Sequence, residues 1–327
     1  MEISKRKICL LGEFKRRDEG LSNIDYYLSA ELSKRIKILE LVTREIFSDI
    51  FWKKIKGFKP DVIHYLHGPS LKSFFITKAI GAYCRSKTVI SATHPIVPHF
   101  LKQMVRILKP DLILIQSDRV NRMFRDLGCK TEFLPNGVDI TRFTSVDREK
   151  KIKLRLKFGI DPEKFIVLHV GHLTKERNLG VLNLIQGDNI QVIVVVSGYF
   201  QKDFNLYNSL RYGGCLILDG FFENIEEIYG LADCYIFPVK KGDSIQSPLS
   251  VMEAMACNLP VVATEFEGLA SLFNEGDGLF FARKEKDFLS ALEIIKKGEI
   301  IVKTRDKILP YSWEKVGEKL EKIYYEL

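Results

Sequence analysis

One carboxylate stands out in the second half of the chain, in the stretch Val-Met-Glu-Ala-Met-Ala. Glu253 occupies the middle of this otherwise apolar run. A charge buried among apolar side chains is costly unless a partner compensates it. A pair of hydroxyl groups on a bound ligand is one such partner, and a structural Lys or Arg is another. Glu253 is therefore a candidate ligand-binding residue, with a structural ion pair as the alternative.

The residues around Glu253 predict a short buried helix followed by a strand. Ser247 is a suitable N-cap, and Pro248 fits the first turn because its missing N–H is not needed there. Asn258 suits a left-handed C-terminal cap, and residues 261–264 form an apolar run typical of a buried strand. The exposed N–H groups at the start of such a helix attract a phosphate.

Residues 248–263, Pro-Leu-Ser-Val-Met-Glu-Ala-Met-Ala-Cys-Asn-Leu-Pro-Val-Val-Ala, resemble the signature of the retaining GT-B glycosyltransferases of family 4, the glycosyl transferases group 1. In that family the helix follows a Glu-x7-Glu motif. Its second Glu holds the nucleotide ribose, its first contacts the donor sugar, and the loop between them cradles the diphosphate. By this resemblance Glu253 is the ribose ligand, whereas Ile245 stands where the first Glu is expected. The resemblance implies donor contacts from Gln246, Ser247, Pro248, Leu249 and Ser250.

Length and composition indicate a globular protein of two domains. The chain has 327 residues, and no apolar run approaches the roughly 20 residues of a membrane span. The apolar run near the N-terminus is too short for a signal peptide. Six scattered cysteines without a C-x-x-C pair favour reduced thiols in a cytoplasm, and the six histidines show no metal-ligand spacing. We therefore expect a cytoplasmic protein without a metal site.

Charge is distributed unevenly between the two halves. Residues 1–150 carry 28 Lys and Arg against 17 Asp and Glu, a net charge of +11, and the remainder carries 22 against 25, a net charge of −3. A basic first half is compatible with nucleic acid, an anionic membrane surface or phosphorylated substrates. A solvated surface rich in lysine is the alternative. No nucleic-acid recognition module is present in the sequence, so we expect no nucleic-acid partner.

The first half alternates helices with buried strands. Lys59-Pro60-Asp61 leads into the apolar strand 62–66, and Lys109-Pro110-Asp111 leads into the strand 112–115. Each is a helix, a Pro-Asp turn and a buried strand, the alternation of a parallel α/β sheet. The first strand, 7–12, is not followed by G-x-G-x-x-G, which disfavours a dinucleotide-dependent oxidoreductase.

Two residues of the first half are candidates for the site. His94 follows the strand 88–92, and open α/β sheets place ligands at the carboxyl ends of their strands. The resemblance implies a His here, near the donor sugar and acceptor, although a His before Pro can also be a loop residue. Gly20 stands where the family has glycines that approach donor phosphate or acceptor. The histidines interpreted as structural are His64, His67 and His99.

The strand 165–171 opens the second half and ends at Gly171. In the family a Gly-Arg pair follows this strand, and a Lys five residues later reaches the diphosphate. In this chain His172 stands in the position of that Arg, and Arg177 stands in the position of that Lys. Arg177 keeps the charge and can bind phosphate bidentately, whereas His172 is charged only part of the time near neutral pH. A solvated loop position is the alternative for both.

Two further donor-side positions follow later strands of the second half. Gly198 ends the strand that begins at Gln191, and Phe221 ends the segment Leu-Ile-Leu-Asp-Gly-Phe at 216–221. The resemblance places Phe221 beside the nucleotide base, and packing in the core is the alternative for this side chain.

The resemblance implies a GT-B fold of two Rossmann-like α/β domains facing a central cleft. Residues 1–148 would form the acceptor-side domain and residues 149–308 the nucleotide-sugar domain, with Pro-Asn-Gly-Val-Asp at 135–139 near the crossing. Residues 309–327 would form a C-terminal helix that packs back on the first domain.

The implied function is transfer of a sugar from a nucleoside diphosphate sugar, of UDP or GDP type, to a glycan or lipid-linked acceptor with retention of configuration. Arg177, His94 and Glu253 are the residues that we expect in the reaction, without a metal or other cofactor. Because Ile245 and His172 depart from the family pattern, a nucleotide-sugar-binding protein that has lost catalysis is the alternative. We also expect peripheral contact with an anionic membrane at its cytoplasmic face.

Overall fold

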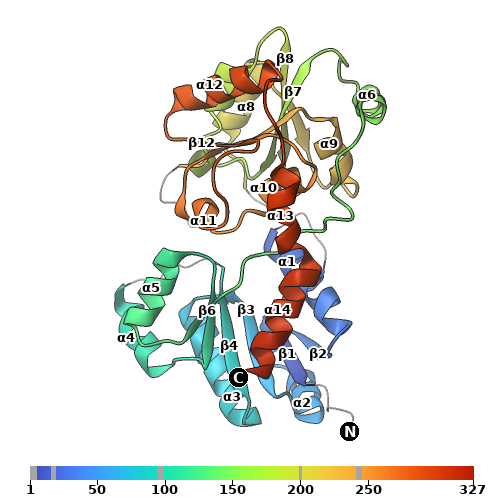
Figure 1. The fold of residues 1–327 in the computed structure, drawn as a ribbon. Helices are drawn as coiled ribbons and strands as arrows, with labels where there is room; N and C mark the ends of the chain where they lie inside the picture. The colour runs from blue at the N-terminus through green and yellow to red at the C-terminus, as the bar shows by residue number, and fades with distance from the viewer. Residues whose placement is uncertain (1–5, 16–19, 94–98, 199–200, 241–244) are drawn as a thin grey trace. The chain divides into compact units, whose positions relative to one another are not determined.

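The computed structural model describes residues 6–15, 20–93, 99–198, 201–240 and 245–327. The chain divides into two compact units (Figure 1). Unit 1 consists of Met1–Gly137, Ser244–Ser247 and Trp313–Leu327, and unit 2 consists of Val138–Asp243 and Pro248–Ser312. Unit 1 ends at Gly137, earlier than the predicted residue 148, because Val138 already forms a parallel bridge with Ser312 of unit 2. The final segment of unit 1 begins at Trp313 rather than at the predicted residue 309.

Unit 1 is built on a six-stranded parallel sheet with the order β2-β1-β3-β4-β5-β6. Apolar runs of the kind seen in the sequence form strands that are buried on both faces. The strands are β1 (Lys7–Gly12), β2 (Lys37–Val42), β3 (Val62–Gly68), β4 (Lys87–Ala92), β5 (Leu112–Ile115) and β6 (Thr131–Phe133).

The helices of unit 1 are α1 (Gly20–Ser33), α2 (Asp49–Phe58), α3 (Leu71–Cys84), α4 (His99–Ile107), α5 (Asp118–Asp126) and α14 (Trp313–Tyr325), with a 3-10 turn η1 at Thr43–Glu45. Local polar residues set two of their starts. The side chain of Ser48 caps α2 through the Phe51 N–H, and Ser70 and Ser73 form a capping box at α3. One hydrophobic core of unit 1 includes Cys9, Ile63 and Phe74.

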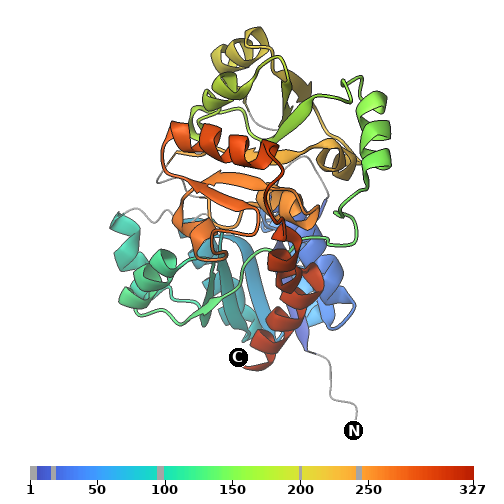
Figure 2. The same cartoon turned by 45° about the horizontal axis from the view of Figure 1, so that its top comes forward.

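Helix α14 lies beside α1 in both views of the fold (Figures 1 and 2). The rings of Tyr27 and Trp313 stack with their centroids 5.8 Å apart. Gly317 is required at the helix crossing, because a Cβ there would lie 2.7 Å from Cγ of Glu31. At the far end of the helix, the Tyr324 hydroxyl hydrogen-bonds Nδ1 of His64 in β3. The C-terminal helix is therefore an integral part of unit 1.

Unit 2 repeats the architecture with the strand order β12-β11-β10-β7-β8-β9, again all parallel. Its strands are β7 (Phe165–Gly171), β8 (Ile190–Val196), β9 (Leu216–Asp219), β10 (Cys234–Phe237), β11 (Val261–Thr264) and β12 (Leu279–Ala282). Its helices are α6 (Arg148–Lys157), α7 (Val181–Ile185), α8 (Phe204–Tyr212), α9 (Ile225–Leu231), α10 (Leu249–Ala256), α11 (Glu267–Ala270), α12 (Glu285–Lys296) and α13 (Thr304–Ile308), with 3-10 turns η2 (Lys175–Arg177) and η3 (Leu309–Tyr311).

The predicted α/β class is confirmed, since both units are parallel sheets covered by helices. Asn258 has the expected left-handed conformation, with φ of 55°. All six cysteines are free thiols. Among the described residues, no helix has the length and apolar character needed to cross a membrane.

His64 is a buried polar side chain of unit 1 with partners on both ring nitrogens. Its Nδ1 bonds the Tyr324 hydroxyl, and its Nε2 lies 2.8 Å from Oγ of Ser91. Burial lowers the pKa of His64 to about 3. The ring therefore stays neutral in the folded state at pH values where an unfolded histidine is protonated.

We predict that His64 makes unit 1 less stable in acid. The pKa of an unfolded histidine is about 6.5, so below that pH the unfolded chain binds more protons. The free energy of unfolding should fall as the pH decreases from about 6.5, by at most about 1.4 kcal/mol per pH unit from this group. Urea unfolding between pH 7 and pH 5, followed by tryptophan fluorescence, measures it, since both tryptophans, Trp52 and Trp313, lie in unit 1. His64→Gln should have a shallower pH dependence, and equal slopes would contradict the prediction.

Candidate active site

Glu253 lies on α10 and is half-buried. The hydroxyl of Tyr229, on α9, donates a hydrogen bond to its Oε2 over 2.7 Å. Tyr229 is fully buried, and burial together with the Glu253 charge raises its pKa well above the ordinary value of 10. Tyr229 therefore remains a proton donor and holds one carboxylate oxygen in place. The sequence interpretation considered a ligand or a cationic side chain as the partner of Glu253 and did not consider a tyrosine.

The start of α10 differs from the prediction. Pro248 rather than Ser247 is the N-cap, and no described side chain caps the helix. Pro248 is extended, with ψ of 116°, so Ser247 precedes the cap. The backbone carbonyl of Ser247 instead accepts a hydrogen bond from Nδ2 of Asn136 over 2.7 Å. The first turn, with Leu249 and Ser250 partly exposed, keeps the electrostatic preference of a helix N-terminus for an anion.

Tyr235 in β10 connects α10 with the neighbouring strand. Its hydroxyl donates to the carbonyl of Val170 in β7 over 3.2 Å and also hydrogen-bonds the side chain of Ser250. Burial raises the pKa of Tyr235, the Ser250 hydrogen bond and the charge of Arg177 lower it, and the charge of Glu253 raises it. The positive charge of Arg177 and the negative charge of Glu253 therefore both act on the buried Tyr235 hydroxyl.

Arg177 ends the 3-10 turn η2 and is half-buried. Its guanidinium carbon lies 5.5 Å from the centroid of the Phe237 ring, a cation–π arrangement. Beneath it, Nδ1 of His169 lies 2.9 Å from the carbonyl oxygen of Ile236. Burial, with smaller contributions from the positive charges of Arg177 and His172, lowers the pKa of His169 to about 4. His169 is thus a neutral, buried neighbour of two cationic positions.

The structure brings together the predicted residues that surround the carboxyl ends of β7 and β10. Arg177 and His172 act on His169, and Ser250 and Glu253 act on Tyr235. Gly171 belongs to the same region, since a Cβ there would lie 3.2 Å from Nε2 of His169. Adjacent parallel strands present their carboxyl ends at one edge of a sheet, where α/β proteins bind ligands.

Gly198 and Phe221 follow the neighbouring strands β8 and β9. Gly198 is exposed, and the Phe221 side chain is 54% exposed. The alternative that Phe221 packs in the core is therefore wrong. A role at the nucleotide base stays a prediction.

Four predicted residues belong to unit 1. Gln246 and Ser247 are buried there. Gly20 is the first residue of α1 rather than part of a loop, and a Cβ there would meet no atom within 4 Å, so a close approach is not what requires glycine. His94 lies outside the described residues.

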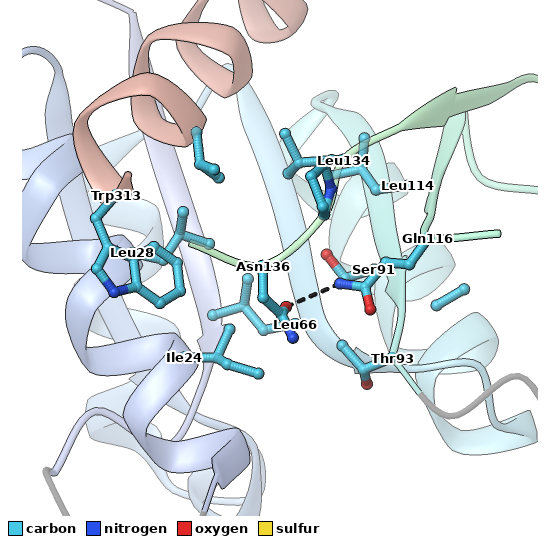
Figure 3. A pocket seen from close by; sticks show the side chains of 13 residues that line it. Ile24, Leu28, Leu66, Ser91, Thr93, Leu114, Gln116, Leu134, Asn136 and Trp313 are labelled. Atoms are coloured by element: carbon cyan, nitrogen blue, oxygen red, sulfur yellow. Dashed lines mark hydrogen bonds between the residues drawn. The ribbon is translucent and has the colours of Figure 1, made fainter. Parts of the chain in front are cut away.

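Asn136 is held in unit 1 by a second amide. Nε2 of Gln116 donates to Oδ1 of Asn136 over 2.8 Å, as the dashed line in Figure 3 shows. Both residues line a small pocket whose remaining wall is mostly apolar, with Leu28, Leu66 and Trp313 among its side chains. This chain of amides ends on the Ser247 carbonyl, directly before α10.

Sequence analysis did not identify the residues that contact the predicted site residues and hold them in position. These are His169, Tyr229, Tyr235 and Phe237 in unit 2, and Gln116 and Asn136 in unit 1. One signal was available, because His169 is a polar residue inside the buried strand Phe-Ile-Val-Leu-His-Val-Gly. Tyrosine and phenylalanine within apolar segments give no such signal, since they are ordinary core residues.

Comparison with known proteins places this geometry in a family. The family described as Glycosyl transferases group 1 matches residues 150–312, the segment that contains Arg177, Tyr235 and Glu253. Residues 150–312 belong to the group 1 glycosyl transferases. The recognition made from residues 248–263 is thereby confirmed.

Relatives share limited identity with this protein over much of the chain. The sulfoquinovosyl transferase SQD2 of Arabidopsis thaliana is 25% identical over 83% of the chain, which spans 58% of that protein's length. The alpha-galactosylglucosyldiacylglycerol synthase of Streptococcus pneumoniae is 22% identical over 84% of the chain, which spans 72% of that protein.

Solved structures extend the likeness to the whole fold. The Anabaena protein Alr3699/HepE, in complex with UDP, has a TM-score of 0.77 at 15% identity, covering 98% of this chain and all of that one. Sucrose-phosphate synthase from Thermosynechococcus elongatus has a TM-score of 0.75 at 13% identity, covering 98% and 99%. The fold is therefore GT-B, with two Rossmann-like domains. Within the described residues, no three His, Cys, Asp or Glu side chains gather as candidate metal ligands.

We predict that Asn136→Ala destabilises unit 1. The substitution removes the oxygen that accepts a hydrogen bond from buried Gln116. It also removes a donor to the Ser247 carbonyl. Loss of a buried hydrogen-bond partner costs about 1–3 kcal/mol. Urea unfolding followed by fluorescence of Trp52 and Trp313 measures the loss. Asn136→Asp, which keeps the acceptor for Gln116 but lacks the donor, should also destabilise. A change below about 0.5 kcal/mol, typical of an ordinary surface substitution, would contradict the prediction.

Proposed function

We propose that this protein transfers a sugar from a nucleoside diphosphate sugar to a hydroxyl group of a glycan or lipid-linked acceptor, with retention of configuration. The observation that carries the proposal is the cluster of Arg177, Ser250 and Glu253 around Tyr235, inside the segment that matches the family. A cation, a helix N-terminus and an oriented carboxylate are the groups that a nucleoside diphosphate requires.

The diphosphate would lie between Arg177 and the first turn of α10. Negative charge grows on the departing diphosphate as the bond to the sugar breaks, and fixed positive groups at that place stabilise the transition state. The cation–π contact with Phe237 restricts the guanidinium before the donor binds. Glu253, held on one oxygen by Tyr229, would accept hydrogen bonds from the ribose hydroxyls.

Retention would follow attack of the acceptor on the same face that the diphosphate leaves, without a protein nucleophile. His94 would lie near the donor sugar, as the resemblance implies. We propose no metal or organic cofactor, and a donor of UDP or GDP type. A complex of the Anabaena neighbour contains UDP and another contains UDP-glucose, and the name of a Corynebacterium glutamicum relative specifies GDP-mannose as its donor.

A second candidate is a nucleotide-sugar-binding protein that has lost catalysis. The observation that favours it is Ile245, an aliphatic residue where the family has a carboxylate for the donor sugar. Both candidates require nucleotide binding, and only the first requires release of the sugar from the donor.

We predict that one nucleoside diphosphate stabilises the protein and that Glu253→Ala abolishes the effect. A ligand at about 100 times its dissociation constant adds roughly 2.7 kcal/mol of stability. Thermal unfolding with UDP, GDP, ADP and NAD in turn measures the shift. Glu293→Ala, an exposed glutamate on α12 of the same unit, is the matched control and should respond like the wild type. Stabilisation by NAD alone would contradict the proposal.

Turnover separates the two candidates. With the base identified, the protein is incubated with UDP-glucose or GDP-mannose, and release of the nucleoside diphosphate is followed. Release that depends on Arg177 and Glu253 supports the transferase. Binding without any release supports the non-catalytic alternative.

We also propose that unit 1 contacts an anionic membrane peripherally, at its cytoplasmic face. Large apolar side chains are exposed around α2 and α3, with Phe47 97% and Phe75 63% exposed. Trp52 and Tyr83 contact each other edge to face, which joins the two helices. Exposed lysines accompany them at positions Lys53, Lys54, Lys72 and Lys78. Apolar side chains that enter the interface, combined with lysines facing anionic headgroups, are typical of peripheral binding. Several relatives are named for glycolipid synthesis.

We predict that liposomes containing phosphatidylglycerol co-sediment the protein better than liposomes of phosphatidylcholine alone. Phe75→Ser should weaken binding about tenfold, since burying a phenylalanine contributes about 1.5–3 kcal/mol. Phe204→Ser is the matched control, because Phe204 is 70% exposed on α8 of unit 2. Binding that does not depend on anionic lipid, or equal weakening by both variants, would refute this contact.

A further inference from the structure

His169 in β7 is fully buried, and only one of its two ring nitrogens has a hydrogen-bond partner among the described residues. Nδ1 lies 2.9 Å from the carbonyl oxygen of Ile236, and a carbonyl only accepts, so Nδ1 carries the proton of the neutral ring. Nε2 then has a lone pair and nothing that donates to it. Buried polar atoms nearly always have a partner. An exception needs a physical reason, and a partner supplied by a ligand is one.

The unsatisfied nitrogen is directed toward the carboxyl end of β7. Residues 169 and 171 lie on the same face of the strand, because side chains alternate along it. A Cβ at Gly171 would lie 3.2 Å from Nε2 and 3.7 Å from Cε1 of His169, so these ring atoms are the ones nearest to the end of the strand. A side chain at position 171 would crowd Nε2. The nitrogen thus faces the edge of the sheet at which α/β proteins bind ligands.

Two aromatic rings of β10 hold the imidazole in this orientation. Tyr235 and Phe237 stack on it with centroid distances of 6.4 and 6.1 Å and interplanar angles of 22° and 30°. Phe237 also contacts the guanidinium of Arg177. The imidazole and this cation therefore share one aromatic support, which places His169 beneath the position proposed for the diphosphate.

The charges around the ring favour an anion as the missing partner. Its charged and titratable neighbours are His172 after β7, Arg177 in η2, and Tyr235 in β10, on which Glu253 of α10 acts. Burial, with smaller contributions from the positive charges of Arg177 and His172, lowers the pKa of His169 to about 4. A phosphate bound beside Arg177 would offset these charges and raise that pKa. The protonated ring donates at both nitrogens, so Nε2–H would find its acceptor in a phosphate oxygen.

We propose that His169 takes up a proton from solvent when a nucleoside diphosphate sugar binds, and that its Nε2–H then donates a hydrogen bond to the diphosphate. The assignment rests on the proposed transferase function and adds a buried, proton-linked cation to it. No covalent bond to the sugar changes in this step, and the proton returns to solvent when the nucleoside diphosphate leaves. During transfer the imidazolium would join Arg177 and the first turn of α10 in stabilising the charge that grows on the leaving group.

Isothermal titration calorimetry counts the protons. UDP-glucose or GDP-mannose, according to the base that stabilises the protein, is titrated at pH 6 in buffers of different ionisation enthalpy. The intact donor is the probe, because its diphosphate does not titrate near this pH, whereas the terminal phosphate of free UDP has a second pKa of about 6. We expect uptake of more than about half a proton per donor bound, and a dissociation constant that falls by up to about tenfold per pH unit between pH 8 and pH 6.

Three variants identify the histidine that binds the proton. His169→Phe keeps an aromatic ring beside Tyr235 and Phe237 but cannot be protonated. It should abolish the uptake and weaken donor binding at pH 6 about tenfold, the loss of roughly one hydrogen bond to a charged group, and should approach the wild type at pH 8. His169→Gln offers an amide that donates without titrating, so it should abolish the uptake and retain part of the affinity. His172→Asn should still take up the proton.

His64→Gln is the matched control. It removes a buried histidine of unit 1 whose pKa is also lowered, to about 3, and it should leave both donor affinity and proton uptake unchanged. Thermal unfolding of each variant without ligand verifies that it is folded.

Three outcomes would overturn the assignment. The first is donor binding to the wild type without proton uptake, the result expected if a hydroxyl of the ligand donates to neutral Nε2. The second is uptake that persists in both His169→Phe and His169→Gln, and the third is donor binding without uptake in His172→Asn. Absence of binding by every nucleotide sugar would instead remove the proposed function, and the assignment with it.

Discussion

A polar side chain inside an apolar core must find a hydrogen-bond partner, and this requirement determines the geometry of the candidate site in unit 2. Glu253 stands on a helix whose other residues are nearly all apolar, and the buried hydroxyl of Tyr229 fixes one of its oxygens. Tyr235 bonds both Val170 and Ser250, which ties α10 to β7 and β10. Arg177 rests on Phe237, so a ring of the core supports the cation. The residues that would meet a ligand are thus held by groups that do not touch it.

The same requirement organises unit 1. His64 is neutral and bonded on both ring nitrogens, which anchors α14 against the sheet. Gln116 and Asn136 form a chain of amides that ends on the Ser247 carbonyl. In each case two buried polar groups hydrogen-bond each other away from water. Removing one of them would leave the other without a partner, which lowers the free energy of unfolding. Asp25 and His67 differ from these pairs because the histidine remains partly accessible.

The family match covers a smaller part of the chain than the likeness in fold. The family model matches residues 150–312, whereas the sequence relatives and the GT-B likeness extend over most of the chain. This division has a physical reason. On the proposed function, the donor diphosphate would require the cation, the helix N-terminus and the carboxylate that lie within residues 150–312. Acceptors differ, so the residues that bind them are free to differ as well.

Local patterns in the sequence were sufficient to predict strands and helices and to identify single polar residues with a chemical role. Apolar strands alternating with helices predicted a parallel sheet in the first half, and the resemblance implied a second one. Strands such as Lys7–Gly12 and Phe165–Gly171 lie where they were expected. Glu253 was recognisable because a charge in an apolar run is costly, and Asn258 because few residues adopt a left-handed conformation.

The hydrogen-bond partners of these polar residues, in contrast, follow from the tertiary structure. Tyr229 reaches Glu253, and Tyr324 reaches His64 from the other end of the chain, through contacts that no local pattern encodes. Ser247 has the right type for an N-cap, yet an extended Pro248 becomes the cap and Asn136 takes the Ser247 carbonyl. His67 in β3 lies beside Asp25 of α1, another contact that no local pattern encodes. Local propensity contributes little energy to such choices, and the pairing of buried polar groups contributes more.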